Sequence, residues 1–194
     1  VYIIPGLCLI GFLLSLINFL VFINPKLKGN IYKYFLTKTI SELLVLGVGT
    51  FYIYGNCINC SVFQTYGVQI YLSYIQTYVM YVGYLYTAFA EIIVVFDRLI
   101  IFYNKSKLNL DWKILTSCSF GFSVLIFFPI LFVHSIQEIP NRPGKFRTVR
   151  TEFGSSTALA LYQNSTLIIL NAFIFTLILF LNILLIKKFK QHLA

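Results

Sequence analysis

The sequence contains few charged residues. Only 11% of its 194 residues are Asp, Glu, Lys or Arg, whereas a soluble domain averages about 25%. Acidic residues are the scarcest, with six Asp and Glu against 15 Lys and Arg. Several stretches of about 20 residues carry almost no charge, which is typical of membrane-spanning helices. The composition therefore argues against an ordinary soluble domain and predicts an integral membrane protein embedded in a lipid bilayer.

Cysteine and histidine are also scarce. The two histidines, His134 and His192, lie far apart, and no nucleophile–base–acid set or histidine–carboxylate metal motif accompanies them. An enzyme is therefore not expected. The net charge of +9 does not indicate a nucleic-acid partner, because the basic residues are divided among the loops between hydrophobic segments. Four cysteines predict neither a disulfide scaffold nor a metal site: Cys8, Cys57, Cys60 and Cys118.

Five hydrophobic segments are long enough to be helices of a membrane bundle. Helices are expected rather than strands, because an open strand leaves its backbone polar groups unsatisfied in lipid. The sequence thus predicts an all-α integral membrane bundle that forms one domain over residues 1–194. The predicted helices cover residues 3–24, 31–55, 67–103, 113–134 and 161–186.

The loops between these segments alternate in charge. The first and third connections and the C-terminal end are rich in lysine, whereas the second connection, Asn56–Tyr66, has no charged residue. Eleven of the 15 Lys and Arg residues fall on one side, which the positive-inside rule assigns to the cytoplasm. A multi-pass plasma-membrane protein with an extracellular N-terminus is therefore expected. The fourth connection, Ser135–Ala160, is predicted to be a long external loop, although it carries Arg142, Lys145, Arg147 and Arg150.

Three glycosylation sequons bear on this orientation. Asn59-Cys-Ser and Asn164-Ser-Thr fall on the predicted outside, and Asn104-Lys-Ser falls on the cytoplasmic side. Because glycans are added outside the cytoplasm, we expect Asn59 and Asn164 to be candidate glycosylation sites and Asn104 to stay unmodified.

The third predicted helix carries a polar stripe. Thr77, Tyr84, Glu91 and Arg98 recur every seven residues, and seven residues make almost two helical turns, so the four share one face. Glu91 is expected to face the bundle interior rather than lipid. Arg98 follows Asp97 at the cytoplasmic end, where it either anchors the helix at the membrane interface or acts inside the bundle.

Polar residues of the first two helices are candidates to meet this stripe. Glu42 lies near the middle of the second helix, and Asn18 lies in the inner half of the first. With Thr87 and Glu91 they are predicted to form a buried polar site whose oxygens hold a proton or Na⁺. The alternative is an ion pair between Glu42 and Lys38, which lies four residues earlier on the same helix.

The outer third of the third helix is rich in tyrosine. Tyrosines near the outer edge suit an interfacial belt, and deeper ones suit either a ligand pocket or simple helix packing. The candidates for an external ligand pocket are Gln76, Thr77, Met80, Tyr81 and Tyr84.

Taken together, these residues resemble the rhodopsin-like (class A) G-protein-coupled receptors. Asp97-Arg98-Leu99 resembles the Asp/Glu-Arg-Tyr motif that ends the third helix of that family, and Ser41-Glu42-Leu43-Leu44 resembles its second-helix Ala-Asp-Leu-Leu. Asn18 matches the family's first-helix Asn, and Thr87 matches the Ser/Thr of its sodium pocket. The likeness covers essentially the whole chain, as the first five of seven helices.

The sequence departs from that family at several positions. The family's usual disulfide is not available, because Ser73 lies near the third-helix position and the second external loop has no cysteine. Cys57 and Cys60 could instead bridge each other. Met80 stands where amine receptors carry an Asp, which argues against a biogenic amine as the ligand.

The resemblance implies a mechanism. Arg98 would pair with Asp97 in the resting state and would be released when helices rearrange and a heterotrimeric G protein docks. Asn18, Glu42 and Thr87 would form the sodium-like site that couples an unknown extracellular ligand to the inner face.

Two other functions remain open from the residues alone. Glu42 and Glu91 could line the path of an ion- or proton-coupled transporter or channel. The chain could also be a structural membrane protein in which Arg98 is only an anchor.

Overall fold

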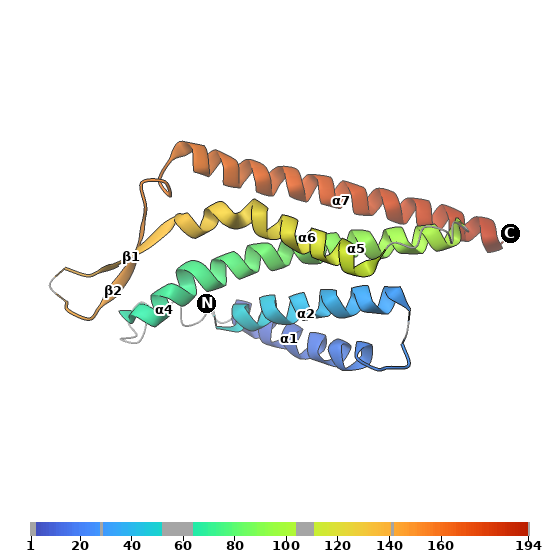
Figure 1. Cartoon of the computed structure of the whole chain (residues 1–194), viewed down its shortest axis with the longest axis horizontal. Helices are drawn as coiled ribbons and strands as arrows, with labels where there is room; N and C mark the ends of the chain where they lie inside the picture. The colour runs from blue at the N-terminus through green and yellow to red at the C-terminus, as the bar shows by residue number, and fades with distance from the viewer. Residues whose placement is uncertain (1–2, 28, 52–63, 104–110, 141, 194) are drawn as a thin grey trace.

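The fold is described by a computed structural model, which covers residues 3–27, 29–51, 64–103, 111–140 and 142–193. It is mostly helical, and the helices run roughly side by side along the long axis of the molecule (Figure 1). The helices and strands are α1 (Ile3–Phe22), α2 (Asn30–Thr50), α4 (Tyr66–Ile70), η2 (Tyr71–Gln76), α5 (Thr77–Phe102), α6 (Trp112–Phe127), η3 (Phe128–Phe132), β1 (His134–Glu138), β2 (Phe146–Arg150) and α7 (Thr157–Leu193).

The third predicted helix is continuous but changes its winding. α4, the π-helical segment η2 and α5 follow one another without a break. The rod that they form is about 55 Å long by helical rise, so it is longer than the roughly 30 Å hydrocarbon core of a bilayer. α7 has 37 residues and is similarly long. Both helices therefore reach beyond the membrane interior if they span it.

The ends of α6 follow from its sequence. Asp111 precedes the helix, and its carboxylate accepts a hydrogen bond from the backbone N–H of Lys113 at 3.0 Å, which caps the first turn. Pro129 lies just after the last α-helical residue, Phe127. Because proline has no N–H to donate back into the helix, the chain continues as the short 3₁₀ segment η3.

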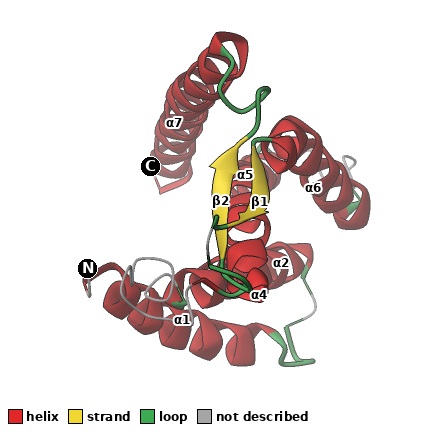
Figure 2. Cartoon of the chain, turned by 90° about the vertical axis from the view of Figure 1, so that its left-hand side faces the viewer, coloured by secondary structure: helices red, strands yellow, loops and turns green. Residues whose placement is uncertain are grey.

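Helix α5 is the centre of the bundle. It packs against α2, α6 and α7, and α1 packs against α2; the end-on view shows the other helices arranged around it (Figure 2). The main apolar core joins Val82 and Leu85 of α5 to Phe127, Ile130 and Ile174 of the following segments. A second, smaller core joins α5 to α7 in their C-terminal halves.

The outer surface is apolar. Leu125, Ile168 and Phe175 are each more than two-thirds exposed. A water-soluble protein with such a surface would aggregate, whereas a bilayer solvates it. Among the described residues, four helical segments are long and apolar enough to cross a membrane: Pro5–Phe22, Tyr66–Ile101, Trp112–Phe132 and Thr157–Gln191. The helical membrane bundle predicted from the sequence is supported to this extent.

The second predicted span differs from the other four. α2 contains Lys33, Lys38 and Glu42 within its 21 residues, which makes it too charged to qualify as a membrane span on composition. Its predicted end, residues 52–55, lies outside the described residues. The charges of α2 therefore need partners inside the bundle, and the next subsection shows that two of them have such partners.

The fourth connection, predicted as a long external loop, contains a short β-hairpin in the otherwise helical bundle. β1 and β2 form an antiparallel hairpin in which His134 pairs with Arg150 and Glu138 with Phe146. At its tip, Gly144 has a φ of 75°, which glycine adopts without strain. The last helix was also predicted too short, at 161–186, because α7 begins at Thr157 and continues to Leu193.

Gly83 sets how closely α5 approaches α2. A Cβ at this position would lie 2.2 Å from Cγ2 of Val45, far inside van der Waals contact. Substituting Gly83→Ala should therefore force the two helices apart and lower the free energy of unfolding by about 1–3 kcal/mol. Thermal unfolding of the purified protein in nanodiscs measures the effect.

Gly121 on α6 provides the matched control. A Cβ there would have no neighbouring atom within 4 Å, so Gly121→Ala should be neutral or stabilising by up to about 1 kcal/mol. Equal effects of the two substitutions would contradict close packing at Gly83.

Candidate functional site

The interface between α2 and α5 contains a short ladder of hydroxyl groups. The Ser41 hydroxyl donates a hydrogen bond to the backbone oxygen of Gly83 at 3.2 Å. The Thr87 hydroxyl in turn donates to the Ser41 Oγ at 3.3 Å. Ser41 is 7% exposed. The missing side chain at Gly83 is what allows the serine to reach the backbone of α5, so the polar ladder and the close helix contact depend on each other.

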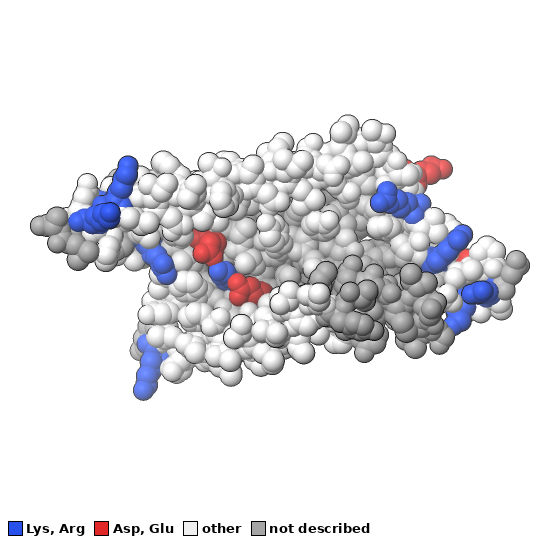
Figure 3. Space-filling model, turned by 180° about the vertical axis from the view of Figure 1, so that it is seen from behind, with Lys and Arg blue, Asp and Glu red and all other residues white. Residues whose placement is uncertain are grey.

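An acid–base cluster lies further along the same interface. The Lys38 ammonium forms an ion pair with the Glu91 carboxylate of α5 and lies 3.8 Å from Oε1 of Glu42 on its own helix. Figure 3 shows one face whose middle is almost free of charge except for a small group in which acidic and basic residues alternate. One cation therefore bridges two carboxylates and ties α2 to α5.

The first helix contributes a hydroxyl group to this cluster. The Ser15 hydroxyl donates to Oε2 of Glu42 at 3.4 Å, and Ser15 is buried. Asn18, which the sequence placed in the site, is exposed and forms no side-chain hydrogen bond with any described residue. The polar contact of α1 is thus made one turn earlier on the helix than predicted.

The cluster changes how the predicted cation site is interpreted. Lys38 supplies a positive charge between Glu42 and Glu91, in the place where a bound Na⁺ was expected. Among the described residues, no group of three or more His, Cys, Asp or Glu side chains has the geometry of a metal site. With one ammonium and two carboxylates, the cluster has a net charge of −1. The arrangement can therefore hold two helices in one register.

The Asp97–Arg98 pair predicted for the resting state is not formed. Within the described part of the chain, no ion pair joins Asp97 to Arg98. The Arg98 guanidinium instead lies over the ring of Phe35 on α2, 5.7 Å from its centroid. Adjacent residues on a helix point about 100° apart, which explains why the two side chains do not meet. Arg98 is exposed and can contact a partner at this end of the bundle.

The five residues predicted to line a ligand pocket do not share one cavity. Thr77 lines a polar cavity at the hairpin end of the bundle, and Gln76 is buried in η2. Tyr81 packs against Phe127 in a tilted arrangement with 5.2 Å between ring centroids. Met80 is 36% exposed.

Tyr84 points toward the last helix. Its hydroxyl donates to Oδ1 of Asn171 on α7 at 2.7 Å, although the residue remains half exposed. Tyr81 and Tyr84 thus make contacts between helices, the alternative considered for the deeper tyrosines, and their role in ligand binding stays a prediction.

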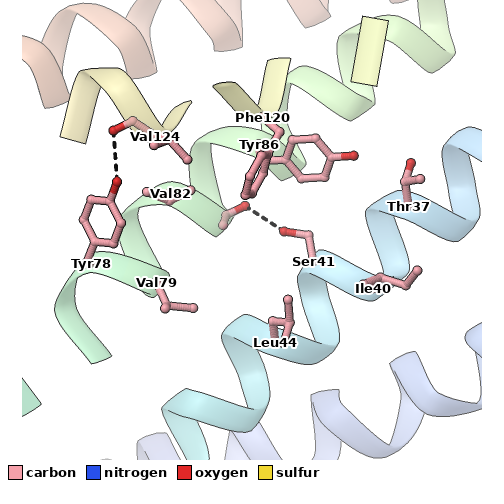
Figure 4. A pocket seen from close by; sticks show the side chains of 11 residues that line it. Thr37, Ile40, Ser41, Leu44, Tyr78, Val79, Val82, Tyr86, Phe120 and Val124 are labelled. Atoms are coloured by element: carbon pink, nitrogen blue, oxygen red, sulfur yellow. Dashed lines mark hydrogen bonds between the residues drawn. The ribbon is translucent and has the colours of Figure 1, made fainter. Parts of the chain in front are cut away.

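An apolar groove lies beside the hydroxyl ladder. It has a volume of about 360 Å³ and is formed by side chains of α2, α5 and α6 (Figure 4). The Tyr78 hydroxyl bridges its far wall by donating to the backbone oxygen of Val124 at 3.1 Å. None of the five predicted ligand residues lines this groove, so its position was not foreseen.

Several predicted residues fall outside the described residues. Asn59, Asn104, Cys57 and Cys60 lie in the segments 52–63 and 104–110, so neither the disulfide nor these two sequons is tested. Asn164 is exposed in the second turn of α7. Its glycosylation remains a prediction.

The importance of Lys38 was only partly visible in the sequence. Its spacing from Glu42 suggested the i,i+4 pair, which is present. Its contact with Glu91, 53 residues later, depends on how α2 and α5 pack. Small polar residues such as Ser15 and Ser41 are enriched where membrane helices pack closely. This preference is the sequence signal that could have identified the two serines as contact residues.

Comparison with known proteins does not identify a relative. No protein family matches the sequence, and no curated protein matches it. The resemblance to receptors therefore rests on the residues named above.

Proposed function

We propose that the chain forms the first five helices of a divergent rhodopsin-like G-protein-coupled receptor in the plasma membrane. In this proposal, α2 is a fifth membrane span, the N-terminus lies outside, and helix rearrangement passes the signal of an extracellular ligand to a heterotrimeric G protein. The observation that carries the proposal is the contact of Lys38 with Glu42 and Glu91, which links α2 to α5 at a partly exposed position on an otherwise apolar face.

This contact supports a switch for a physical reason. In a low-dielectric interior an ion pair is strong, and an unpaired charge is costly. A small shift of α5 along α2 therefore meets a barrier and leads to a second discrete arrangement rather than to a continuum. Because α5 follows directly from the segment under the hairpin and ends beyond Arg98, one rigid helix connects an outer event to the inner face.

The test is nucleotide exchange on a reconstituted G protein, with the receptor carrying all of its membrane helices. Arg98→Ala should lower the basal exchange rate about tenfold or more, because a charge-assisted contact with the G protein is lost. Asp97→Asn should change the rate little, because no Asp97–Arg98 ion pair is formed in the structure.

Lys113→Ala is the matched control for this test. Lys113 is an exposed basic residue in the first turn of α6 and should tolerate the change. At equal surface expression, wild-type exchange by Arg98→Ala would contradict the receptor proposal. Proton or sodium flux in proteoliposomes that is lost on Glu91→Gln would favour a transporter instead.

A further inference from the structure

A polar cavity lies between the β-hairpin and the outer end of the third helix. Its volume is about 440 Å³, within the range of small-molecule sites. One wall is formed by α4, η2 and the start of α5, and the other wall by β1, β2 and the residue after β1. Figure 1 shows the hairpin at the same end of the molecule as α4.

Specific hydrogen bonds fix the hairpin over this cavity. The Thr148 hydroxyl donates to Oε1 of Gln69 at 2.7 Å and lies 2.6 Å from the Ser73 hydroxyl. Gln69 and Ser73 are 3% and 5% exposed. The Tyr74 hydroxyl donates to the backbone oxygen of His134 at 2.8 Å. The cavity is therefore held between two fixed elements and is not a gap beneath a loose loop.

The charge of the lining favours an anion. Arg147 lines the cavity, and no Asp or Glu is found among its described lining residues. The carboxylate of Glu138 on the same hairpin turns to the tip, where it accepts a hydrogen bond from Gly144 at 2.6 Å. Arg150 lies opposite His134 in the hairpin register and adds a second positive charge nearby.

His134 supports the same conclusion. Its Nδ1 atom is buried and has no hydrogen-bond partner among the described residues. Burial, with a contribution from the positive charge of Arg150, lowers the pKa of the His134 imidazole, so the ring is neutral near pH 7. In the tautomer that carries the proton on Nδ1, a bound carboxylate can supply the acceptor that this atom lacks.

The remaining wall is apolar. Leu72, Ile139 and Phe146 line the cavity, and the Phe146 ring packs against Tyr66 with 5.2 Å between centroids. A ligand that fits this lining carries a negative charge at one end and a short apolar body at the other.

We infer that this cavity is the receptor's ligand site and that it binds small organic acids, with the carboxylate on Arg147 and the body against Leu72 and Phe146. The inference rests on the proposed function for the role of the site, but the binding itself does not require a G protein.

Binding is measured with the purified chain in zwitterionic nanodiscs, using saturation-transfer NMR. The probes are 3-phenylpropionate and hexanoate, each compared with its uncharged amide. Both acids should bind more tightly than their amides. Arg147→Gln should raise their Kd about tenfold, because a charge-assisted contact is lost.

Arg142→Gln is the matched control. It removes the same charge from the same hairpin, near the tip and outside the described lining, and should leave the Kd unchanged. Equal affinity for acids and amides, or equal Kd values in the two variants, would overturn the inference. If acids bind as expected and nucleotide exchange is independent of Arg98, the site stands and the receptor proposal fails.

Discussion

Replacing Lys38 with methionine should destabilise the bundle more than any other single substitution considered above. The change leaves Glu42 and Glu91 as two carboxylates without their shared cation. A charged side chain left unpaired in the membrane interior costs about 2.5–3.5 kcal/mol on insertion scales, because lipid around the helices offers no water to replace the lost contact. Thermal unfolding in nanodiscs should therefore show a large drop in Tm for Lys38→Met.

The control for this prediction is Lys33→Met, five residues earlier on the same helix. Lys33 lies over the ring of Trp112 at 5.5 Å and forms no ion pair with a described residue. Its loss should cost about 1 kcal/mol or less. Adding Glu42→Gln and Glu91→Gln to Lys38→Met should restore most of the stability, because the uncompensated charges are then gone. If Lys38→Met and Lys33→Met gave equal drops, the bridging role would be wrong.

The same variant tests the cation site. Lys38 already neutralises one carboxylate, so wild-type Tm should be the same in sodium chloride and in choline chloride. In Lys38→Met, Na⁺ can take the place of the ammonium, so sodium should raise the Tm relative to choline.

The second large expected effect is glycosylation of an added sequon in the hairpin. The glycan is either present or absent, and its presence reports the orientation of the chain in the membrane. Substituting Pro143→Thr completes an Asn-Xaa-Thr sequon that begins at Asn141, which falls between the two strands in the sequence. If the hairpin lies outside the cell, this site should be glycosylated in microsomes, because the sequon stands beyond the membrane-spanning part of the bundle. A gel shift removed by endoglycosidase measures the modification.

This experiment needs a background without the other external sequons. Asn59→Gln and Asn164→Gln together provide it, and Pro143→Ala is the control that adds no sequon. Asn104-Lys-Ser remains in place and should stay unmodified. A glycan at Asn104, with none at the hairpin, would reverse the predicted orientation.

The helices were predictable because their signals are local. A long run without charge fixes a helix in lipid, and the predicted 67–103 and 3–24 agree with the observed Tyr66–Phe102 and Ile3–Phe22 within a few residues. The i,i+4 pair of Lys38 and Glu42 was also local, and it was weighed as one of two alternatives.

The hairpin was not predictable from the same kind of signal. Its strands, His134–Glu138 and Phe146–Arg150, are short and rich in polar residues, and the turn lacks the Asn-Gly or Asp-Gly pair that marks many hairpins. Its stability comes from Thr148 and Phe146 packing on α4 and η2. Those contacts join residues about 80 positions apart, which the sequence alone does not reveal.

The polar site was only half predictable for a similar reason. Asn18, Glu42, Thr87 and Glu91 were expected to meet. Lys38 joins only Glu42 and Glu91, whereas Thr87 bonds to Ser41 and Asn18 is exposed. The prediction did not include these two links, because the register of α2 against α5 depends on the bare surface at Gly83.

The π-helical segment η2 has a consequence for how mutations along this helix should be grouped. Each π turn takes up about one residue more than an α turn, so the seven-residue repeat that aligns Thr77 with Glu91 does not extend unchanged to Tyr71. The residues that share one face of the helix therefore follow one seven-residue repeat before η2 and another, offset by one residue, after it. A deletion of one residue within Tyr71–Gln76 would convert the π turn to an α turn and keep the hairpin's platform facing the same way, whereas the same deletion within α5 would rotate one part of the helix against the other by about 100°.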